Sequence, residues 1–278
     1  MDLPTQTPPP QIYKVLLTGG PMAGKSTGIQ HLSAKFTSLG LKVFTIPEIA
    51  TQTINNGFLF YEHQTFALKS RFNYQITKHQ YDLEDYYTQC AEILRESQGH
   101  SVLVIYDRGI LDNWSYITME VKDHIYGKYN WSDHSLLNGR YSGVFHLVTI
   151  ADMDPAKYTD QNDQFGRIEK PLESVLLDRK NRHMYLLEEN FWVIDNPAKI
   201  TKKQDGIDRK MDNLYGTICQ VLGLEHGLNY PGSKFLGFKK PTLLDAADPE
   251  KFYEDWDSIG LKPIMDQEVR ILWLTVKY

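Results

Sequence analysis

The stretch VLLTGGPMAGKSTGIQHL, Val15–Leu32, joins an apolar run to a glycine-rich loop and then to a helical pattern. Within it, Gly19-x-x-x-x-Gly24-Lys25-Ser26 fits the phosphate-loop pattern in full. Glycines let the backbone curl so that several N–H groups point at one anion. Lys25 can reach the outer phosphates of a nucleotide, and the Ser26 hydroxyl can ligate Mg²⁺. The stretch therefore predicts a phosphate site formed by Gly19, Gly20, Pro21, Met22, Ala23, Gly24, Lys25, Ser26 and Thr27.

The residues on either side of this loop support the prediction. Ile12–Thr18 is typical of a strand with a continuous apolar core, and apolar residues then recur at helical spacing from Ile29 to Leu39. Gly40 is a good signal for the end of that helix. A phosphate held by the loop would lie on the positive N-terminus of the helix. A chance glycine-rich turn is the alternative, and the strand before and helix after it argue against that alternative.

The composition excludes several classes of protein. The chain has 278 residues and a net charge of -5 with no basic stretch, which argues against nucleic acid as a partner. Cys90 and Cys219 are too few for a disulfide framework and favour a reducing compartment. No apolar run approaches the roughly 20 residues needed to cross a bilayer. The opening MDLPTQTPPP lacks the apolar middle of a signal peptide, so we expect a cytoplasmic protein.

Strands alternate with helices along the chain. After the first strand and helix, further strands are expected at 41–48, 101–109, 143–150 and 191–197, with helices at about 62–97, after Pro171 and at 207–222. This alternation implies a parallel sheet covered on both faces. The expected fold is α/β, a P-loop NTPase three-layer sandwich with a parallel five-stranded sheet and a short C-terminal appendage.

Three segments follow from this reading. Residues 1–10 form an extended, proline-rich arm, and residues 11–224 form a P-loop, kinase-like nucleotide-binding domain. From residue 225 the chain becomes rich in Gly, Pro and Lys, and we interpret 225–278 as an appendage, a small β unit.

Charged residues follow the third expected strand, at the sheet edge where ligands bind in such folds. Asp107 can hold Mg²⁺ opposite Ser26, directly or through water; a strand-end turn or a helix cap is its alternative role. Arg108 can clamp a substrate phosphate or hydroxyl because arginine presents a rigid fork of donors. A structural ion pair is the alternative for Arg108.

Three further candidates lie on other segments. Glu48 follows the second strand and can take the proton of an acceptor hydroxyl, or instead cap the helix that starts near Ala50. Arg167 lies in a polar segment that can act as a lid and bring a cation to the transferring phosphate, or belong to a solvated helix face. Asp195 and Asn196 can line a nucleobase pocket or form an ordinary turn.

Several other chemistries find no support. No Cys/His spacing indicates zinc, and no Gly-x-Ser-x-Gly elbow occurs. DQFG at Asp163–Gly166 does not end a strand, and KKQD at Lys202–Asp205 lacks the Asn or Thr that guanine readers place before Lys-x-Asp. A switch GTPase is therefore disfavoured.

With these residues in place, the chain resembles the NadR/Ttd14-type nucleotide-binding domains, an AAA-like branch of the P-loop kinases. The resemblance covers about Tyr13–Leu224 and rests on YKVLLTGGPMAGKSTG, KVFTIPEIAT, VLVIYDRGILDNWSY, RIEKPLESVLLDRK and VIDN. It implies that Glu48 activates the acceptor hydroxyl, that Asp107 and Arg108 are the Asp-Arg pair after the third strand, and that Arg167 is the lid arginine. The lid departs from the family pattern, because Pro171 follows it closely and fewer arginines are in register.

Some relatives in that branch carry a C-terminal domain of the triphosphate-tunnel type and are associated with GTP and phosphoinositide binding. Residues 225–278 are too short for that whole domain and lack its alternating charged strands. Phosphoinositide binding is therefore not carried over to this chain.

Two functions are in competition. The first is a small-molecule kinase that uses Mg²⁺ with ATP or GTP and transfers phosphate to a nucleoside-like or nucleotide-like acceptor. The second is a non-catalytic, nucleotide-binding structural or regulatory subunit of a larger assembly, for example cytoskeletal or ciliary, in which a protein partner holds the arm and the tail. Both need Lys25 and Ser26, whereas only the first needs Glu48, Arg108 and Arg167 to converge on an open pocket.

Overall fold

Five strands form a single parallel sheet, as the alternating sequence pattern predicts. They are β1 Ile12–Thr18, β2 Lys42–Ile46, β3 Val102–Asp107, β4 Gly143–Leu147 and β5 Phe191–Ile194. Their order in the sheet is β2-β3-β1-β4-β5, and every pairing is parallel. The computed structural model describes residues 9–58, 65–155, 170–197 and 203–224. Residues 1–8 of the predicted arm, the lid arginine and the C-terminal appendage lie outside these ranges.

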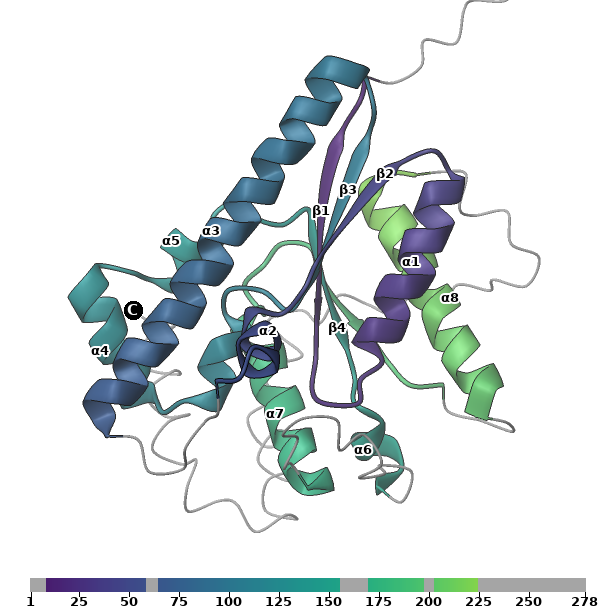
Figure 1. Cartoon of the computed structure of the whole chain (residues 1–278). Coiled ribbons are helices and arrows are strands. Elements are labelled where there is room, and N and C mark those ends of the chain that lie inside the picture. The colour runs from purple at the N-terminus through teal and green to yellow at the C-terminus, as the bar shows by residue number, and fades with distance from the viewer. Residues whose placement is uncertain (1–8, 59–64, 156–169, 198–202, 225–278) are drawn as a thin grey trace, which may run out of the picture. The chain divides into compact units, whose positions relative to one another are not determined.

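Helices connect and cover the strands (Figure 1). They are α1 Lys25–Ser38, α2 Ile49–Asn55, α3 Phe66–Gln98, α4 Met119–Tyr129, α5 Asp133–Leu137, α6 Ile150–Met153, α7 Pro171–Met184 and α8 Lys203–Leu222, with a short 3-10 helix, η1, at Asp112–Tyr116. No helix in the described ranges combines the length and the apolar character that crossing a membrane requires.

Alternate side chains of the central strands point to opposite faces of the sheet and pack into two separate hydrophobic cores. The sheet therefore lies between two layers of helices. Val15 and Leu17 of β1 pack with α1 and α8, where Phe36 and Leu214 are fully buried. Leu16 points to the other face and packs in the core formed with α3, α4 and α5. Figure 1 shows α1 and α8 on one side of the sheet, and α3 and α4 on the other. The expected P-loop NTPase sandwich is confirmed.

All four later strands end two or three residues before their expected ranges do, and the structure gives a reason for two of them. β3 stops at Asp107 because Arg108 adopts a left-handed conformation, φ 64°, which extended pairing cannot accommodate. β4 stops at Leu147, and Thr149 instead caps α6 by accepting a hydrogen bond from the N–H of Ala151 at 3.4 Å. Both changes turn the chain at the carboxyl edge of the sheet, where the predicted site residues gather.

Candidate functional site

The loop after β1 has the backbone of an anion-binding concavity. Gly19, Met22 and Gly24 all have positive φ, at 137°, 57° and 91°. A Cβ at Gly19 would lie 2.2 Å from the carbonyl oxygen of Leu147, so only glycine fits where the loop leaves the sheet. α1 begins directly after Gly24, and no side chain caps its N-terminus. The first N–H groups of α1 and its positive dipole end therefore remain available to an anion.

Lys25 is folded back onto the loop. It is buried, and its ammonium donates to the carbonyl oxygens of Gly19 at 3.0 Å and Gly20 at 2.9 Å. Burial lowers the pKa of Lys25 to about 8. Ser26 and Thr27, in contrast, are exposed. The charged head of Lys25 thus lies inside the loop, where a bound phosphate would be.

A polar stripe on α7 supports the loop from behind. Asp178 accepts hydrogen bonds from the N–H groups of Gly20 at 2.7 Å and Thr149 at 3.0 Å, and its other oxygen lies 3.0 Å from Nε2 of His146. Burial alone would raise the pKa of Asp178, but His146 and the two N–H groups outweigh burial and lower it. Asn181, one turn further along α7, donates to the carbonyl oxygen of Gly19 at 3.3 Å.

The last helix supplies a second brace. Lys210 on α8 is buried, and its ammonium donates to the carbonyl oxygens of Ala23 at 2.9 Å and Val148 at 2.6 Å. Its third contact is the side-chain oxygen of Asn196, also at 2.9 Å. Burial lowers the pKa of Lys210 to about 8. Two lysines therefore hold the loop carbonyls, one from inside the loop and one from outside.

Asp107 meets the requirements of a metal ligand beside the loop. Its Oδ1 atom is buried and has no hydrogen-bond partner among the described residues, which is costly for a carboxylate unless a ligand pairs with it. Burial raises the pKa of Asp107, and Lys25 is the charge that most opposes this shift. Ser26, at the end of the loop, is exposed, and a hydroxyl and a carboxylate are donors that suit Mg²⁺, which takes few protein ligands together with phosphate oxygens.

Arg108 joins two carboxylates that come from distant segments. Its Nε lies 3.1 Å from Oε1 of Glu48, and its Nη1 lies 3.5 Å from Oδ1 of Asp112. Arg108 is only 6% exposed, so this is a buried charge cluster. Asp112 also accepts hydrogen bonds from the Thr18 hydroxyl at 2.5 Å and from the Tyr185 hydroxyl at 2.8 Å. The cluster ties the loop after β3 to the end of β1 and to the residue after α7.

Glu48 stands at the N-cap position of α2, but its carboxylate does not cap the helix backbone. One oxygen pairs with Arg108, and the other accepts a hydrogen bond from the Thr51 hydroxyl at 2.8 Å. The helix-cap alternative for Glu48 is therefore not supported, because its side chain makes no capping hydrogen bond at the start of α2.

A cleft opens beside this cluster. Its cavity volume is about 30 Å³, within a depression that is open to solvent, and it lies between α2, α3 and the segment that follows β3. Polar groups from three elements line it, including Glu48, Thr77, Gln80, Arg108, Asn113 and Tyr116. Glu48 and Arg108 are thus brought together with an open pocket beside them.

The remaining predicted residues are placed differently. The Asn196 side chain donates to the carbonyl oxygen of Thr149 at 2.9 Å and accepts from Lys210, so its amide is committed to the protein. Asp195 is exposed and accepts a hydrogen bond from the N–H of Asn196 at 2.8 Å. Arg167 lies outside the described residues.

Two supports of the phosphate loop were not predicted, Lys210 on α8 and the polar face of α7, although the sequence contained a signal for each. Lys210 lies between Ile207 and Leu214 on the apolar face of the last helix, and a lysine in that phase is out of place unless it is paired. Ser174, Asp178 and Asn181 recur at helical spacing, which identifies one face of α7. That face resembled a solvated one, but all three side chains are buried.

Comparisons with known proteins identify the family. A family model described as AAA domain matches residues 14–193, which is more than half of the chain. Among solved structures the chain is similar to thymidylate kinase from Ehrlichia chaffeensis, with 12% identity and a TM-score of 0.47, over 75% of this chain and 100% of that one. No curated protein matches the sequence. The match of the family model, over a region that includes the phosphate loop, shows that the chain belongs to the AAA domain family.

Proposed function

We propose that this protein is a small-molecule kinase that binds ATP or GTP with Mg²⁺ and transfers the terminal phosphate to a hydroxyl group of an acceptor in the cleft. The phosphate loop, Gly19–Thr27, would hold the nucleotide phosphates, and Lys25 would turn from the loop carbonyls to the outer phosphates. We expect the protein to act in the cytoplasm, as the composition and the two cysteines indicate.

One observation carries the proposal: Glu48 and Arg108 form an ion pair in the wall of an open cleft, beside the phosphate loop. Arg108, Asp107 and Glu48 lie close enough to Lys25 to shift its pKa, so the acid, the cation and the loop lysine belong to one electrostatic unit. A phosphoryl transfer site needs this arrangement, because positioning and charge stabilisation supply most of its catalysis.

Asp107 and Ser26 are the residues that would hold Mg²⁺. When bound, the ion would neutralise charge on the phosphate oxygens. Asp107 suits this role because its unpartnered oxygen is buried next to Lys25. The loop N–H groups and Lys25 would hold the phosphates in line with the acceptor.

The reaction would balance as follows. Glu48 accepts the proton of the acceptor hydroxyl as that oxygen forms a bond to the terminal phosphorus. The bond between this phosphorus and the bridging oxygen breaks, and the electron pair leaves with the nucleoside diphosphate. Arg108 holds the Glu48 carboxylate in the cleft wall and places a positive charge near the transferring group.

Two predicted roles remain part of the proposal. Arg167 would act as a lid cation that closes over the phosphates and excludes water. Asp195 would contribute to the nucleobase end of the site through the turn that it forms with Asn196. Asn196 would act through its backbone, because its side chain is bound to Thr149 and Lys210.

The second candidate is non-catalytic nucleotide binding, in which the protein is a structural or regulatory subunit of a larger assembly. The observation that favours it is the burial of Arg108 between two carboxylates, which leaves its charge already paired before any substrate binds. In that case the cluster would stabilise the fold rather than act on an acceptor, and a protein partner would hold the arm and the tail.

A labelling screen distinguishes the two. The full chain is incubated with ATP or GTP labelled in the terminal phosphate, Mg²⁺, and a panel of nucleosides and nucleoside monophosphates. Transfer of label to an acceptor supports the kinase. The non-catalytic subunit is supported if the protein binds nucleotide tightly but labels no acceptor. A nucleotide-bound structure should then show the terminal phosphate facing no open pocket.

A further inference from the structure

A second pocket lies between α3 and α4, and it shares no described lining residue with the cleft beside Glu48. Its volume is about 370 Å³, which is within the roughly 300–1,000 Å³ that small-molecule sites occupy. Arg71 and Ser70 line it from α3, while His124, Lys128 and Tyr129 line it from α4. The pocket is therefore large enough for a ligand and is built from two helices that the phosphate site does not use.

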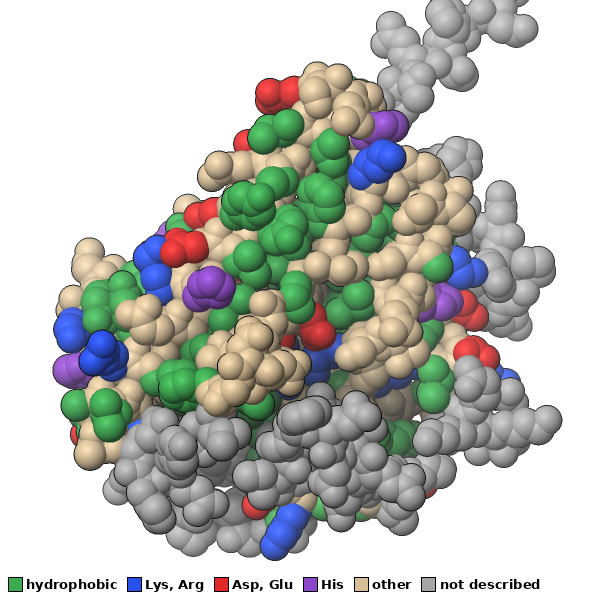
Figure 2. Space-filling model, in the orientation of Figure 1, with side chains coloured by type: hydrophobic (Ala, Val, Ile, Leu, Met, Phe, Trp, Pro, Cys, Tyr) green, Lys and Arg blue, Asp and Glu red, His purple; other side chains and the backbone are tan. Residues whose placement is uncertain are grey.

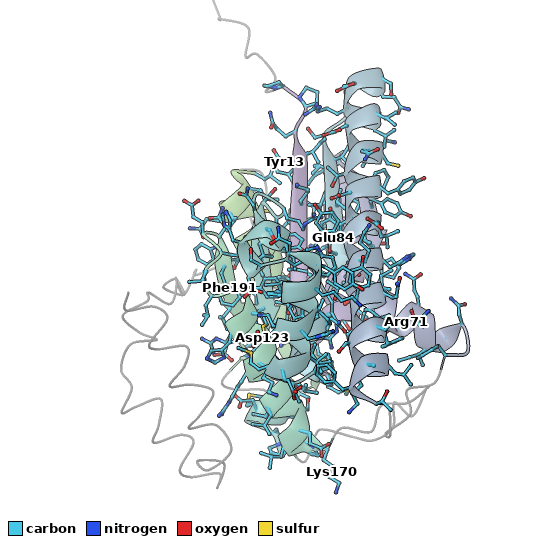
Figure 3. The ribbon with its side chains drawn as sticks, turned by 90° about the vertical axis from the view of Figure 1, so that its left-hand side faces the viewer. Tyr13, Arg71, Glu84, Asp123, Lys170 and Phe191 are labelled. Atoms are coloured by element: carbon cyan, nitrogen blue, oxygen red, sulfur yellow. The ribbon has the colours of Figure 1, made fainter. Side chains whose placement is uncertain are left out.

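The charges that line this pocket all have one sign. Arg71 and Lys128 are the cationic side chains, His124 lies beside them, and no carboxylate is among the described lining residues. Neither Arg71 nor Lys128 forms an ion pair with any part of the chain that the structure describes. Figure 2 shows basic side chains and a histidine gathered at the left-hand edge, over α3 and α4. Asp123, labelled on α4 in Figure 3, is the acid next to His124 and does not line the pocket.

Ser70 provides an independent indication of a ligand. It lines the pocket and is 5% exposed, yet its hydroxyl has no hydrogen-bond partner among the described residues. A buried hydroxyl without a partner is costly, and most buried polar groups in proteins are paired. Because serine has three staggered χ1 positions, the hydroxyl can turn toward a molecule in the pocket.

The pocket has a polar part and an apolar part, which suit the charged group and the organic group of an organic anion. Ser70 and Arg71 lie in the second turn of α3, and both face the pocket. Ile125 and the Tyr129 ring supply apolar surface, and Tyr129 is fixed by stacking on Tyr74 with ring centroids 3.6 Å apart. A phosphate group would meet the cations and the serine while the rest of the ligand packs on Tyr129.

We propose that this pocket binds the phosphate group of a small phosphorylated molecule, at a site separate from the phosphate loop. Arg71 and Lys128 supply the charge and Ser70 supplies a hydroxyl donor. The inference does not depend on kinase activity, since it uses no residue of the loop or of the cleft beside Glu48.

The test is a titration of the ¹⁵N-labelled full chain with inorganic phosphate, followed residue by residue by NMR. We expect saturable shifts of the backbone signals of residues 67–75 and 124–129, which sodium chloride at the same ionic strength does not reproduce. The Arg71→Gln, Lys128→Gln double variant should bind phosphate at this site at least about tenfold more weakly, since hydrogen bonds to charged groups are lost. The control, Lys69→Gln, removes an exposed lysine of α3 that does not line the pocket and should bind as the unaltered chain does.

A third variant separates binding from folding. Ser70→Ala should weaken phosphate binding without lowering the Tm, because the hydroxyl that it removes has no partner to lose. Shifts confined to the signals of residues 19–27 would mean that phosphate binds only at the loop, and would overturn the proposal. Equal affinity in the double variant and the unaltered chain would also overturn it.

Discussion

Lys210, near the start of the last helix, donates a hydrogen bond to the carbonyl oxygen of Ala23 within the phosphate loop, at 2.9 Å. The same ammonium donates to Val148 at the end of the neighbouring strand. The loop is therefore joined to β4 and to α8 by a single side chain. Its anion-binding shape is set by the folded domain, so a nucleotide would find the loop already formed.

Lys210→Met should weaken both the fold and the nucleotide site. The carbonyl oxygens of Ala23 and Val148 lose a charged donor in a buried place, and we expect the free energy of unfolding to fall by about 2–3 kcal/mol. Urea denaturation measures the loss, and calorimetry with Mg-ATP should show weaker binding. The matched control is Arg209→Met, which removes an exposed neighbouring cation and should change neither quantity. Equal stability of the two variants would show that Lys210 does not brace the loop.

Lys25→Ala should weaken nucleotide binding by about 1.5–3 kcal/mol, because it removes a positive charge that would contact the outer phosphates. Calorimetry with ATP and with GTP, each with and without Mg²⁺, measures the change. The free energy of unfolding should also fall, by about 1–3 kcal/mol, because the carbonyl oxygens of Gly19 and Gly20 lose a buried donor. Unchanged affinity for both nucleotides would exclude a phosphate contact by this lysine.

Glu48→Gln should separate binding from turnover. The amide keeps the size of the side chain but cannot accept the acceptor's proton, so phosphate transfer should slow by roughly 10²–10⁴-fold. Nucleotide affinity should change little, because Glu48 lies in the cleft wall and not in the loop. Glu92→Gln, an exposed acid on α3, is the control and should retain full activity. A Glu48→Gln enzyme with normal turnover would remove this residue from the chemistry.

Glu84 lies behind the cleft wall, on the face of α3 that turns toward the sheet (Figure 3). It is fully buried, accepts a hydrogen bond from Gln80 at 2.9 Å and lies 3.4 Å from the guanidinium of Arg140. Tyr141 also donates to it, at 3.1 Å. Burial raises the pKa of Glu84 from 4.5 to about 7, which means that the folded protein holds this proton more tightly than the unfolded chain does.

This shift predicts a pH dependence with a definite sign. A raised folded pKa contributes stability that is fully present below about 4.5 and is lost as pH rises through about 7. Glu84→Gln lacks that titration, so the variant should gain stability relative to the unaltered chain between pH 5 and pH 8. The relative slope should reach at most about 1.4 kcal/mol per pH unit, which corresponds to one proton. Urea denaturation at four pH values provides the test, and a difference that does not vary with pH would contradict the raised pKa.

The local elements were predictable because their signals are local. The first strand was predicted at Ile12–Thr18, where β1 lies, and the helical pattern that was followed to Leu39 ends in the structure at Ser38. The apolar runs located all five strands. The contacts of single charged side chains were not predictable in the same way. Arg108 was assigned either to a substrate or to an ion pair, and nothing in periodicity could indicate that Glu48 and Asp112 lie on either side of it.

The same limit applies to the loop supports. Asp178 and Lys210 lie far along the chain from Gly20 and Ala23, and only the packing of α7 and α8 against the sheet brings them together. For Lys210 the signal was its place on the apolar face of the last helix, whereas the polar face that carries Asp178 did not indicate burial. The groups that Asp178 and Lys210 contact were not predictable, because a buried charge needs a partner but its own sequence position does not identify that partner.

The order of the strands in the sheet also affects when the phosphate loop can fold during synthesis. β1 pairs with β3, at Ile12 with Val102, and with β4, at Val15 with Gly143, so the strand that carries the phosphate loop has no partner close to it in the sequence. Closing such long segments is slow because chain entropy opposes it. As a ribosome makes this protein, the loop emerges early, but the lysine that fixes it, Lys210, emerges after all five strands. A nascent chain halted before α8 should therefore hold the complete phosphate-loop motif and still be unable to retain a nucleotide.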